Sequence, residues 1–296
     1  MTWTIRIVRH VIGLVLMAVI AALMAATLVR LAPGADSDER ELDPRFSQQS
    51  IDAIHQTRAA DRNLLHYYSN YVSRVAHGDF GQSYSLQRPV RELIADRGPV
   101  TLRLAGGGLI TGWILGFSLA LIVTQAKARV FDFVASGFSA ALLCVPAALL
   151  GILILATRAP WPFAIALIVT PKVFAYSREL LGKVAGDPHI LLARAKGLGP
   201  ARIVLWHLLP SILPELLALA GVTVSIAFSA AIPIEAVCDI PGAGQLAWQA
   251  ALSRDLPILV TITLLLALIT RAANTAADLA ILALRPAEPA FIEVDA

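Results

Sequence analysis

The sequence predicts an all-α membrane protein with about six transmembrane helices, and three observations support this fold class. Hydrophobic residues make up 57% of the 296 residues and charged residues only 15%. The mean hydropathy of +0.70 is well above that of a typical soluble domain. The apolar residues gather in long runs between short charged segments, and a run of about 20 apolar residues is what a helix needs to cross a bilayer.

Charge, cysteine content and motifs argue against several other classes of protein. The formal net charge of +3 is too small for a nucleic-acid-binding surface, so no nucleic-acid partner is expected. Cys144 and Cys238 lie in different apolar segments and predict neither a disulfide framework nor a metal site. The chain has no phosphate loop of the form G-x-x-x-x-G-K-S/T, so we expect no ATP hydrolysis by this chain and no cofactor.

The first apolar run covers residues 11–29 and follows Arg6 and Arg9. A cleaved signal peptide is the alternative interpretation, because a short Leu-Ala-Pro-Gly sequence follows the run. The run is longer than the apolar core of a signal peptide, and further spans follow it, so we favour an uncleaved first span. We therefore interpret residues 1–32 as a cytoplasmic N-terminus and a first transmembrane helix, since basic residues before a span stay in the cytoplasm.

Residues 33–99 have mixed charge and no spanning run, which predicts an extracytoplasmic insertion of small helices. Near its end the sequence reads Gly-Asp-Phe-Gly-Gln-Ser from Gly78 to Ser83, and the two glycines around Asp79 allow a tight backbone path. Pro99 is expected in the first turn of the next helix, where the missing N–H of proline costs no hydrogen bond.

Five further apolar runs predict the remaining spans. They cover residues 104–124, 133–157, 161–181, 212–234 and 257–284. In the second span Gly108, Gly112 and Gly116 recur at every fourth residue, which predicts a smooth strip for close helix packing. Pro146 is expected to kink the third span, either beside a transport pathway or simply within the helix bundle.

The segment between the fourth and fifth spans predicts two short cytoplasmic helices. Asp187 followed by Pro188 is typical of a helix start, because the carboxylate can accept a hydrogen bond from a free backbone N–H. Gly197 is expected to end this helix, and Pro200 to begin a second helix that runs on into the fifth span. This arrangement would hold the first helix across the membrane surface.

The run Ala-Arg-Ala-Lys-Gly-Leu from Ala193 to Leu198, with Leu-Pro at positions 209 and 210, resembles a known family. It is similar to the cytoplasmic coupling loop of binding-protein-dependent ABC importers of the dipeptide, oligopeptide and nickel type. The resemblance implies an ATPase-coupling loop at 183–210 with these site residues: Ala193, Arg194, Ala195, Lys196, Gly197 and Pro210. Leu191 stands where the family motif has glutamate, and Leu192 where it has its first alanine.

Two further segments resemble the B-type permease subunits of these importers. One is the Gly-Asp-Phe-Gly-Gln-Ser segment and its continuation to Leu102. The other is similar to the family's extracytoplasmic Glu-x-x-x-x-x-Pro-Gly-x-Gly turn, and it is formed by Glu235, Pro241, Gly242 and Gly244. A Pro-Gly pair supports a tight reversal, after which a short partial helix is expected.

The resemblance implies a permease subunit with the type I ABC importer fold. Its domains would be residues 1–32, the insertion 33–99, a permease core 100–284 and a cytoplasmic tail 285–296. It implies as partners a second permease subunit, two ABC ATPase subunits, an extracytoplasmic solute-binding protein and the lipid bilayer. The expected location is a bacterial or archaeal cytoplasmic (inner) membrane, with both termini in the cytoplasm, and the cargo would be a peptide or a similar small solute.

Three polar residues within predicted spans are candidates for lining the transport pathway: Ser225, Ser229 and Lys172. The serine hydroxyls have an alternative, which is hydrogen bonding to carbonyls of their own helix. Lys172 has one as well, because its long side chain could extend to the cytoplasmic face. An ion-driven secondary carrier and a transport-inactive membrane scaffold are the alternative functions, and ATP-dependent uptake would separate both from an importer.

Overall fold

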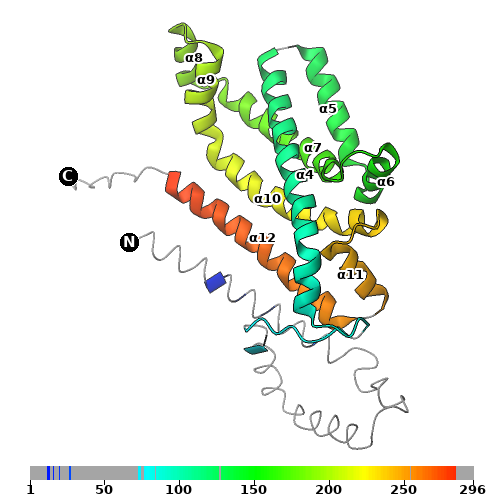
Figure 1. The fold of residues 1–296 in the computed structure, drawn as a ribbon. Coiled ribbons are helices and arrows are strands. Elements are labelled where there is room, and N and C mark those ends of the chain that lie inside the picture. The colour runs from blue at the N-terminus through cyan, green and yellow to red at the C-terminus, as the bar shows by residue number, and fades with distance from the viewer. Residues whose placement is uncertain are drawn as a thin grey trace, which may run out of the picture. The chain divides into compact units, whose positions relative to one another are not determined.

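The computed structural model describes residues 12–13, 16, 20, 27, 73–74, 77–83, 85–126, 128–253 and 255–284. Apart from an isolated bridge between Gln82 and Pro89, the regular structure of these residues is helical, which confirms the all-α prediction (Figure 1). Most of the predicted first span, most of the predicted helical insertion and the C-terminal tail lie outside the described residues. The predicted domain boundaries stay predictions.

The helices follow one another along the chain with short connections. Their bounds are α4 (Val90–Ala126), α5 (Arg129–Leu143), α6 (Ala147–Thr157), α7 (Pro162–Val184), α8 (Pro188–Ala195), α9 (Pro200–Ile203), a π-helical turn η2 (Val204–Leu208), α10 (Leu209–Val237), α11 (Ala243–Leu252) and α12 (Leu256–Leu284).

Several of these helices are long and apolar enough to cross a membrane. Among the described residues they are the segments Val90–Ala126, Pro200–Val237 and Leu256–Leu284, with the bent pair α5 and α6 as a fourth candidate. Helix α7 covers the predicted fourth span with 23 residues, which include the charged residues Lys172, Arg178, Glu179 and Lys183. The protein is therefore a multi-pass membrane protein.

Pro146 breaks the predicted third span rather than kinking it. Helices α5 and α6 are bent by 104° at this point (Figure 1). Proline has no N–H to continue the helix, and it forces the preceding residue, Val145, out of helical backbone angles. The carbonyl of Pro146 then accepts hydrogen bonds from Leu149 and Leu150, which starts α6 in a new direction.

Pro99 lies inside a helix and not in its first turn. Helix α4 begins at Val90, so Pro99 is an interior residue of a 37-residue helix. The apolar run predicted as the second span, residues 104–124, lies within α4, and the helix itself begins earlier. The sequence analysis did not predict these first turns as part of the helix, because they are polar and carry no apolar periodicity.

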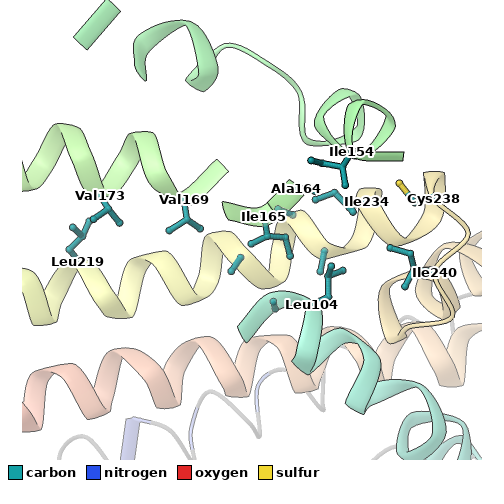
Figure 2. Close-up of a cluster of buried hydrophobic side chains, with 14 residues drawn as sticks. Leu104, Ile154, Ala164, Ile165, Val169, Val173, Leu219, Ile234, Cys238 and Ile240 are labelled. Carbon is teal, nitrogen blue, oxygen red and sulfur yellow. The ribbon is translucent and has the colours of Figure 1, made fainter. Parts of the chain in front are cut away.

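By its internal contacts the chain divides into two compact units. One comprises Pro99–Gln245 with Ile269–Ala296, and the other Met1–Gly98 with Leu246–Leu268. In the first unit a buried apolar cluster joins α4, α6, α7 and α10, and Figure 2 shows its side chains, among them Leu104, Ile165 and Ile234.

The glycine strip on α4 permits close contact with α7, as the sequence predicted. A Cβ atom on Gly108 would lie 2.5 Å from the Cβ of Ile165, and one on Gly112 would lie 2.8 Å from the Cβ of Val169. Real Cβ atoms do not approach so closely, so only glycine allows this separation of the two helices.

In the other unit, buried Asp255 ties two distant segments together. Its Oδ2 accepts hydrogen bonds from Ser83 Oγ at 2.6 Å, Ser85 Oγ at 2.7 Å and Ser85 N at 2.9 Å. An apolar cluster that includes Val90, Leu246 and Ile258 lies in the same unit. The predicted glycine turn is confirmed here, because Gly78 and Gly81 have φ angles of 76° and 80°.

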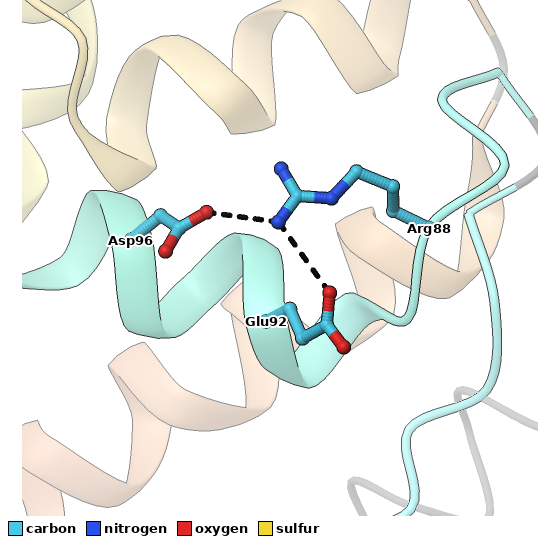
Figure 3. A network of polar contacts seen from close by, with 3 residues as sticks. All are labelled: Arg88, Glu92 and Asp96. Atoms are coloured by element: carbon cyan, nitrogen blue, oxygen red, sulfur yellow. Dashed lines mark hydrogen bonds and ion pairs between the residues drawn. The ribbon is translucent and has the colours of Figure 1, made fainter.

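An exposed polar network marks the start of α4. Arg88 donates from Nη2 to Asp96 Oδ2 at 3.0 Å and to Glu92 Oε2 at 3.4 Å (Figure 3). Both hydrogen bonds raise the pKa of the Arg88 guanidinium, the one with Asp96 more than the one with Glu92. The guanidinium is therefore protonated in the physiological range. Exposed ion pairs of this kind contribute little to stability.

Candidate functional site

The cytoplasmic helix predicted between the fourth and fifth spans is α8. Its C-terminal end is a Schellman motif, in which the N–H of Leu198 donates to the carbonyl of Ala193 at 3.3 Å and the N–H of Gly197 to that of Arg194 at 2.9 Å. Gly197 has a φ of 73°, a left-handed conformation that glycine adopts without strain. The predicted glycine stop is therefore confirmed.

The start of α8 differs in detail from the prediction. Asp187 is the N-cap residue, but its side chain makes no capping hydrogen bond. Its backbone carbonyl accepts instead from Ile190 and Leu191, both at 3.0 Å. Pro188 is the first helical residue as predicted, since a proline at this position loses no hydrogen bond.

A small apolar core supports α8 from one side. Ile190 and Ala193 are buried with Ile203 of α9 and Leu208 of the π-helical turn. The other side of α8 is open: Leu191 and Leu192 are 51% and 56% exposed. Four predicted coupling residues are exposed next to these leucines, namely Arg194, Ala195, Lys196 and Gly197. The loop thus presents an apolar surface with cations beside it.

The connection from α8 back to the fifth span is a continuous helical segment. Pro200 begins α9, as predicted, and α9 passes through the π-helical turn into α10 (Figure 1). In that turn the N–H of Leu209 donates to the carbonyl of Val204. Pro210 follows directly, and its missing N–H leaves no regular helical bond to the carbonyl of Trp206. The wider turn occurs where regular helix hydrogen bonding is interrupted.

At the far end of α10 the predicted turn is built around Glu235. This residue is fully buried. Its Oε2 accepts hydrogen bonds from the N–H of Gly244 at 2.7 Å and the N–H of Gln245 at 3.2 Å. Glu235 therefore caps the N-terminal end of α11, the short helix that was expected after the turn.

Neither glycine of this turn leaves room for a larger side chain. A Cβ on Gly242 would overlap the Glu235 carboxylate, and one on Gly244 would lie 2.7 Å from the Cα of Ile232. The N–H of Ala243 donates to Thr101 Oγ1 of α4 at 2.8 Å, which fixes the turn to a second helix. Pro241 precedes these contacts, so the four predicted turn residues lie in one compact arrangement.

The model of one protein family matches residues 108–287, and its description is "Binding-protein-dependent transport system inner membrane component". This chain belongs to that family. The matched region contains the α8 loop and the Glu235 turn, two of the three segments that carried the resemblance, and the third, residues 78–102, precedes it. The chain is thus a permease component, and its all-helical architecture agrees with that assignment.

Relatives of this permease have been described in Escherichia coli. The permease is 29% identical to the oligopeptide transport system permease protein OppB of strain K12, over 80% of this chain and 84% of OppB. It is 24% identical to the glutathione transport system permease protein GsiC of strain K12, over 95% of this chain and 97% of GsiC.

A solved structure has the same fold. It is an inward-facing conformation of the MetNI methionine ABC transporter, in which the matched chain has 20% sequence identity and a TM-score of 0.59. The match covers 66% of this permease and 97% of that chain. At this identity the likeness shows the fold alone, and it confirms the type I importer permease fold.

Within the described part of the chain, the three candidate pathway residues are all at least partly accessible. Ser225 is half-buried and Ser229 exposed, on the same side of α10 as exposed Val222. Neither serine hydroxyl hydrogen-bonds to a carbonyl of its own helix, in contrast to Thr223, which bonds to Ala220. Lys172 is exposed on α7.

The sequence analysis did not predict the pair between Asp132 of α5 and Arg178 of α7. The guanidinium binds the carboxylate through two nitrogens, with Nη2 at 2.6 Å from Oδ2. The pair borders an open cavity of about 510 Å³, which is also lined by Arg129, Glu179 and Lys183. Opposite charges near predicted span ends were the available signal, but residues 46 positions apart cannot be paired from the sequence.

The sequence analysis also missed the role of Asp255. An aspartate two residues before Pro257 is typical of a helix start, and the carbonyl of Asp255 does accept from the N–H of Leu259 at 3.2 Å. Its hydroxyl partners, however, lie 170 and 172 residues away in the chain. No local pattern identifies such a contact.

Proposed function

We propose that this permease forms the translocation pathway of an ATP-driven importer for peptides or similar small solutes. In this assembly it pairs with a second permease subunit, two cytoplasmic ABC ATPase subunits and an extracytoplasmic solute-binding protein. It hydrolyses no ATP itself. The names of its relatives, an oligopeptide permease and a glutathione permease, support a peptide-like cargo.

The single observation that carries the proposal is the construction of the α8 loop. A short helix is stopped by a Schellman motif at Gly197 and supported by its own apolar core. Its open side presents Leu191 and Leu192 with Arg194 beside them. Exposed leucines next to a basic side chain on a short, rigid helix suit a groove of a partner protein better than they suit water.

Mechanical coupling follows from the connections of this helix. The π-helical turn leads from the α8 loop directly into α10, and α7 leads into the loop from the other side. A partner that moves α8 therefore pulls on two long helices at once. ATP-driven closure of the ATPase subunits would in this way switch the permease between two conformations, as rigid-body transitions do in other proteins.

Leu191 changes the chemistry expected at the ATPase contact. The family's glutamate would offer a charge at this position, whereas Leu191 offers apolar surface. We infer that contact with the ATPase subunit depends here on burial of the two leucines together with the charge of Arg194. Burying a leucine side chain contributes about 1.5–3 kcal/mol, so the missing glutamate does not by itself prevent coupling.

The proposal is tested by purifying the tagged permease from its native host and identifying the subunits that co-purify. The same purification is repeated with Arg194→Glu, with Gly197→Val and with Gly199→Val as the matched control. Gly197 has a positive φ that valine tolerates poorly, whereas Gly199 has an extended backbone with φ of −64° and open space around it. ATP-dependent uptake into membrane vesicles is measured for each variant.

We expect an ABC ATPase to co-purify with the native chain and with Gly199→Val, and to be reduced at least tenfold with the other two variants. Each variant must still be present in the membrane at the native level. Full transport by Gly197→Val would refute the role of the α8 loop. The absence of any ATPase from a correctly folded native preparation would refute the importer assignment.

A further inference from the structure

Lys172 lies in the middle of α7. It lies ten positions after Pro162, the first residue of the helix, and twelve positions before Val184, the last. At about 1.5 Å per residue it is roughly 15 Å from either end, whereas the stem of a lysine side chain reaches only about 6 Å. The helix continues to Val184, and the first charged side chains after Lys172 are those of Arg178 and Glu179, six and seven residues further along it.

The side chain belongs to a polar stripe along one face of α7. Lys172, Tyr176, Glu179 and Lys183 are all exposed, and their spacing of four, three and four residues places them on one side of the helix. We call these four residues the α7 stripe. Other faces of α7 carry buried residues such as Val169 and Val173, which contact the glycine strip of α4.

Within the described part of the chain, the positive charge of Lys172 is not balanced. The neighbouring charges are already paired: Lys183 Nζ lies 2.7 Å from Glu179 Oε1, and Arg178 binds Asp132. Lys172 makes no ion pair with any carboxylate of the described residues. A lone cation at this depth is costly in lipid but not in a water-filled space.

The α7 stripe leads to such a space. Glu179 and Lys183 line the open cavity of about 510 Å³ at the end of α7 that precedes the α8 loop. The stripe is therefore continuous from an open, charged cavity to the middle of the helix. A face of this kind suits a water-filled pathway and not the hydrocarbon of the bilayer.

We propose that the α7 stripe lines the translocation pathway and that Lys172 is a transient binding site for a carboxylate of the passing solute. This inference rests on the proposed function. The exposed ammonium group can donate hydrogen bonds to a carboxylate and attract it electrostatically, while water keeps the contact weak enough for release. Lys172 would thus favour solutes with a negatively charged group at the midpoint of the pathway.

The electrostatic part of the proposal is tested without knowing the cargo. Tyr176, one helical turn from Lys172, is replaced by cysteine in the assembled importer, and exposed Cys144 is replaced by serine. The modification rates of Tyr176→Cys by an anionic thiosulfonate (ethylsulfonate) and a cationic one (ethyltrimethylammonium) are then compared. The Cys144→Ser protein without the Tyr176→Cys substitution is the control for any reaction of buried Cys238.

We expect both reagents to react, and Lys172→Gln to lower the ratio of anionic to cationic modification about tenfold, as loss of one nearby charge predicts. Lys172→Arg should keep the ratio. Failure of both reagents would mean that the stripe faces lipid or protein. An unchanged ratio in Lys172→Gln would mean that another subunit neutralises the lysine. Either result would overturn the inference.

Competition with a soluble probe identifies the carboxylate preference. N-acetyl-trialanine should slow modification of Tyr176→Cys more than its C-terminal amide does, and the difference should disappear in Lys172→Gln. Equal effects of the acid and the amide would overturn the carboxylate site. Because ATP-dependent uptake is measured on the same assembly, a failure of this inference in a working importer is distinguishable from a failure of the proposed function.

Discussion

At the scale of single residues, Glu235 shows how a buried acidic side chain can organise a turn. Its carboxylate accepts two backbone N–H groups at the start of α11, and no side chain larger than hydrogen fits at Gly242 beside it. A buried carboxylate is costly unless hydrogen bonds compensate it. The Pro-Gly-x-Gly pattern is therefore a packing requirement of the glutamate as well as a turn signal.

Replacement of Gly242 by alanine should lower the free energy of unfolding by about 1–3 kcal/mol, because the new methyl group would displace the carboxylate. Gly182→Ala is the matched control: Gly182 is an exposed helical glycine with open space around it. That substitution should be neutral or stabilise by up to about 1 kcal/mol. Thermal unfolding in detergent measures both variants, and equal effects would contradict the role of Glu235.

At the scale of helices, the glycine strip sets the distance between α4 and α7. Gly112→Leu should lower the thermal midpoint strongly, since the Cβ alone would lie 2.8 Å from that of Val169. Gly106→Leu, on the same helix but with nothing within 4 Å, should change the midpoint little. If both leucines were tolerated equally in detergent, the close α4–α7 contact would be wrong.

The pair between Asp132 and Arg178 joins α5 to the helix that enters the α8 loop. Both side chains are partly exposed, at 34% and 40%, so solvent screening limits their interaction. A double-mutant cycle with alanine should give a coupling free energy of about 1 kcal/mol that decreases with added salt. The more exposed pair of Glu179 and Lys183 should show no measurable coupling free energy. A larger coupling free energy for this pair than for Asp132 and Arg178 would contradict the prediction that the less exposed pair interacts more strongly.

At the scale of the whole molecule, the proposed topology places the α8 loop in the cytoplasm and the segment before α4 outside. Leu86 and Gly199 are exposed positions of these two segments. With Cys144 replaced by serine, Leu86→Cys should react with a membrane-impermeant thiol reagent in intact spheroplasts. Gly199→Cys should react only after permeabilisation, and labelling of Gly199→Cys in intact spheroplasts would refute the topology.

The amino-acid sequence by itself determined the features that depend on neighbours along the chain. Apolar runs predicted the membrane helices, and the Gly197 stop and the Pro188 and Pro200 starts followed from backbone chemistry within a few residues. The α8 loop and the Glu235 turn were predicted for the same reason, since each is a short continuous motif.

Only the tertiary structure decided which distant groups meet. The serines bound by Asp255 lie 170 and 172 residues before it, and Arg178 lies 46 residues after Asp132. The packing of the surrounding helices decides whether Pro146 kinks a helix or breaks it. It also decides that α4 begins at Val90, well before Pro99. Such choices are settled by packing between helices, a free-energy contribution that no local pattern of residues contains.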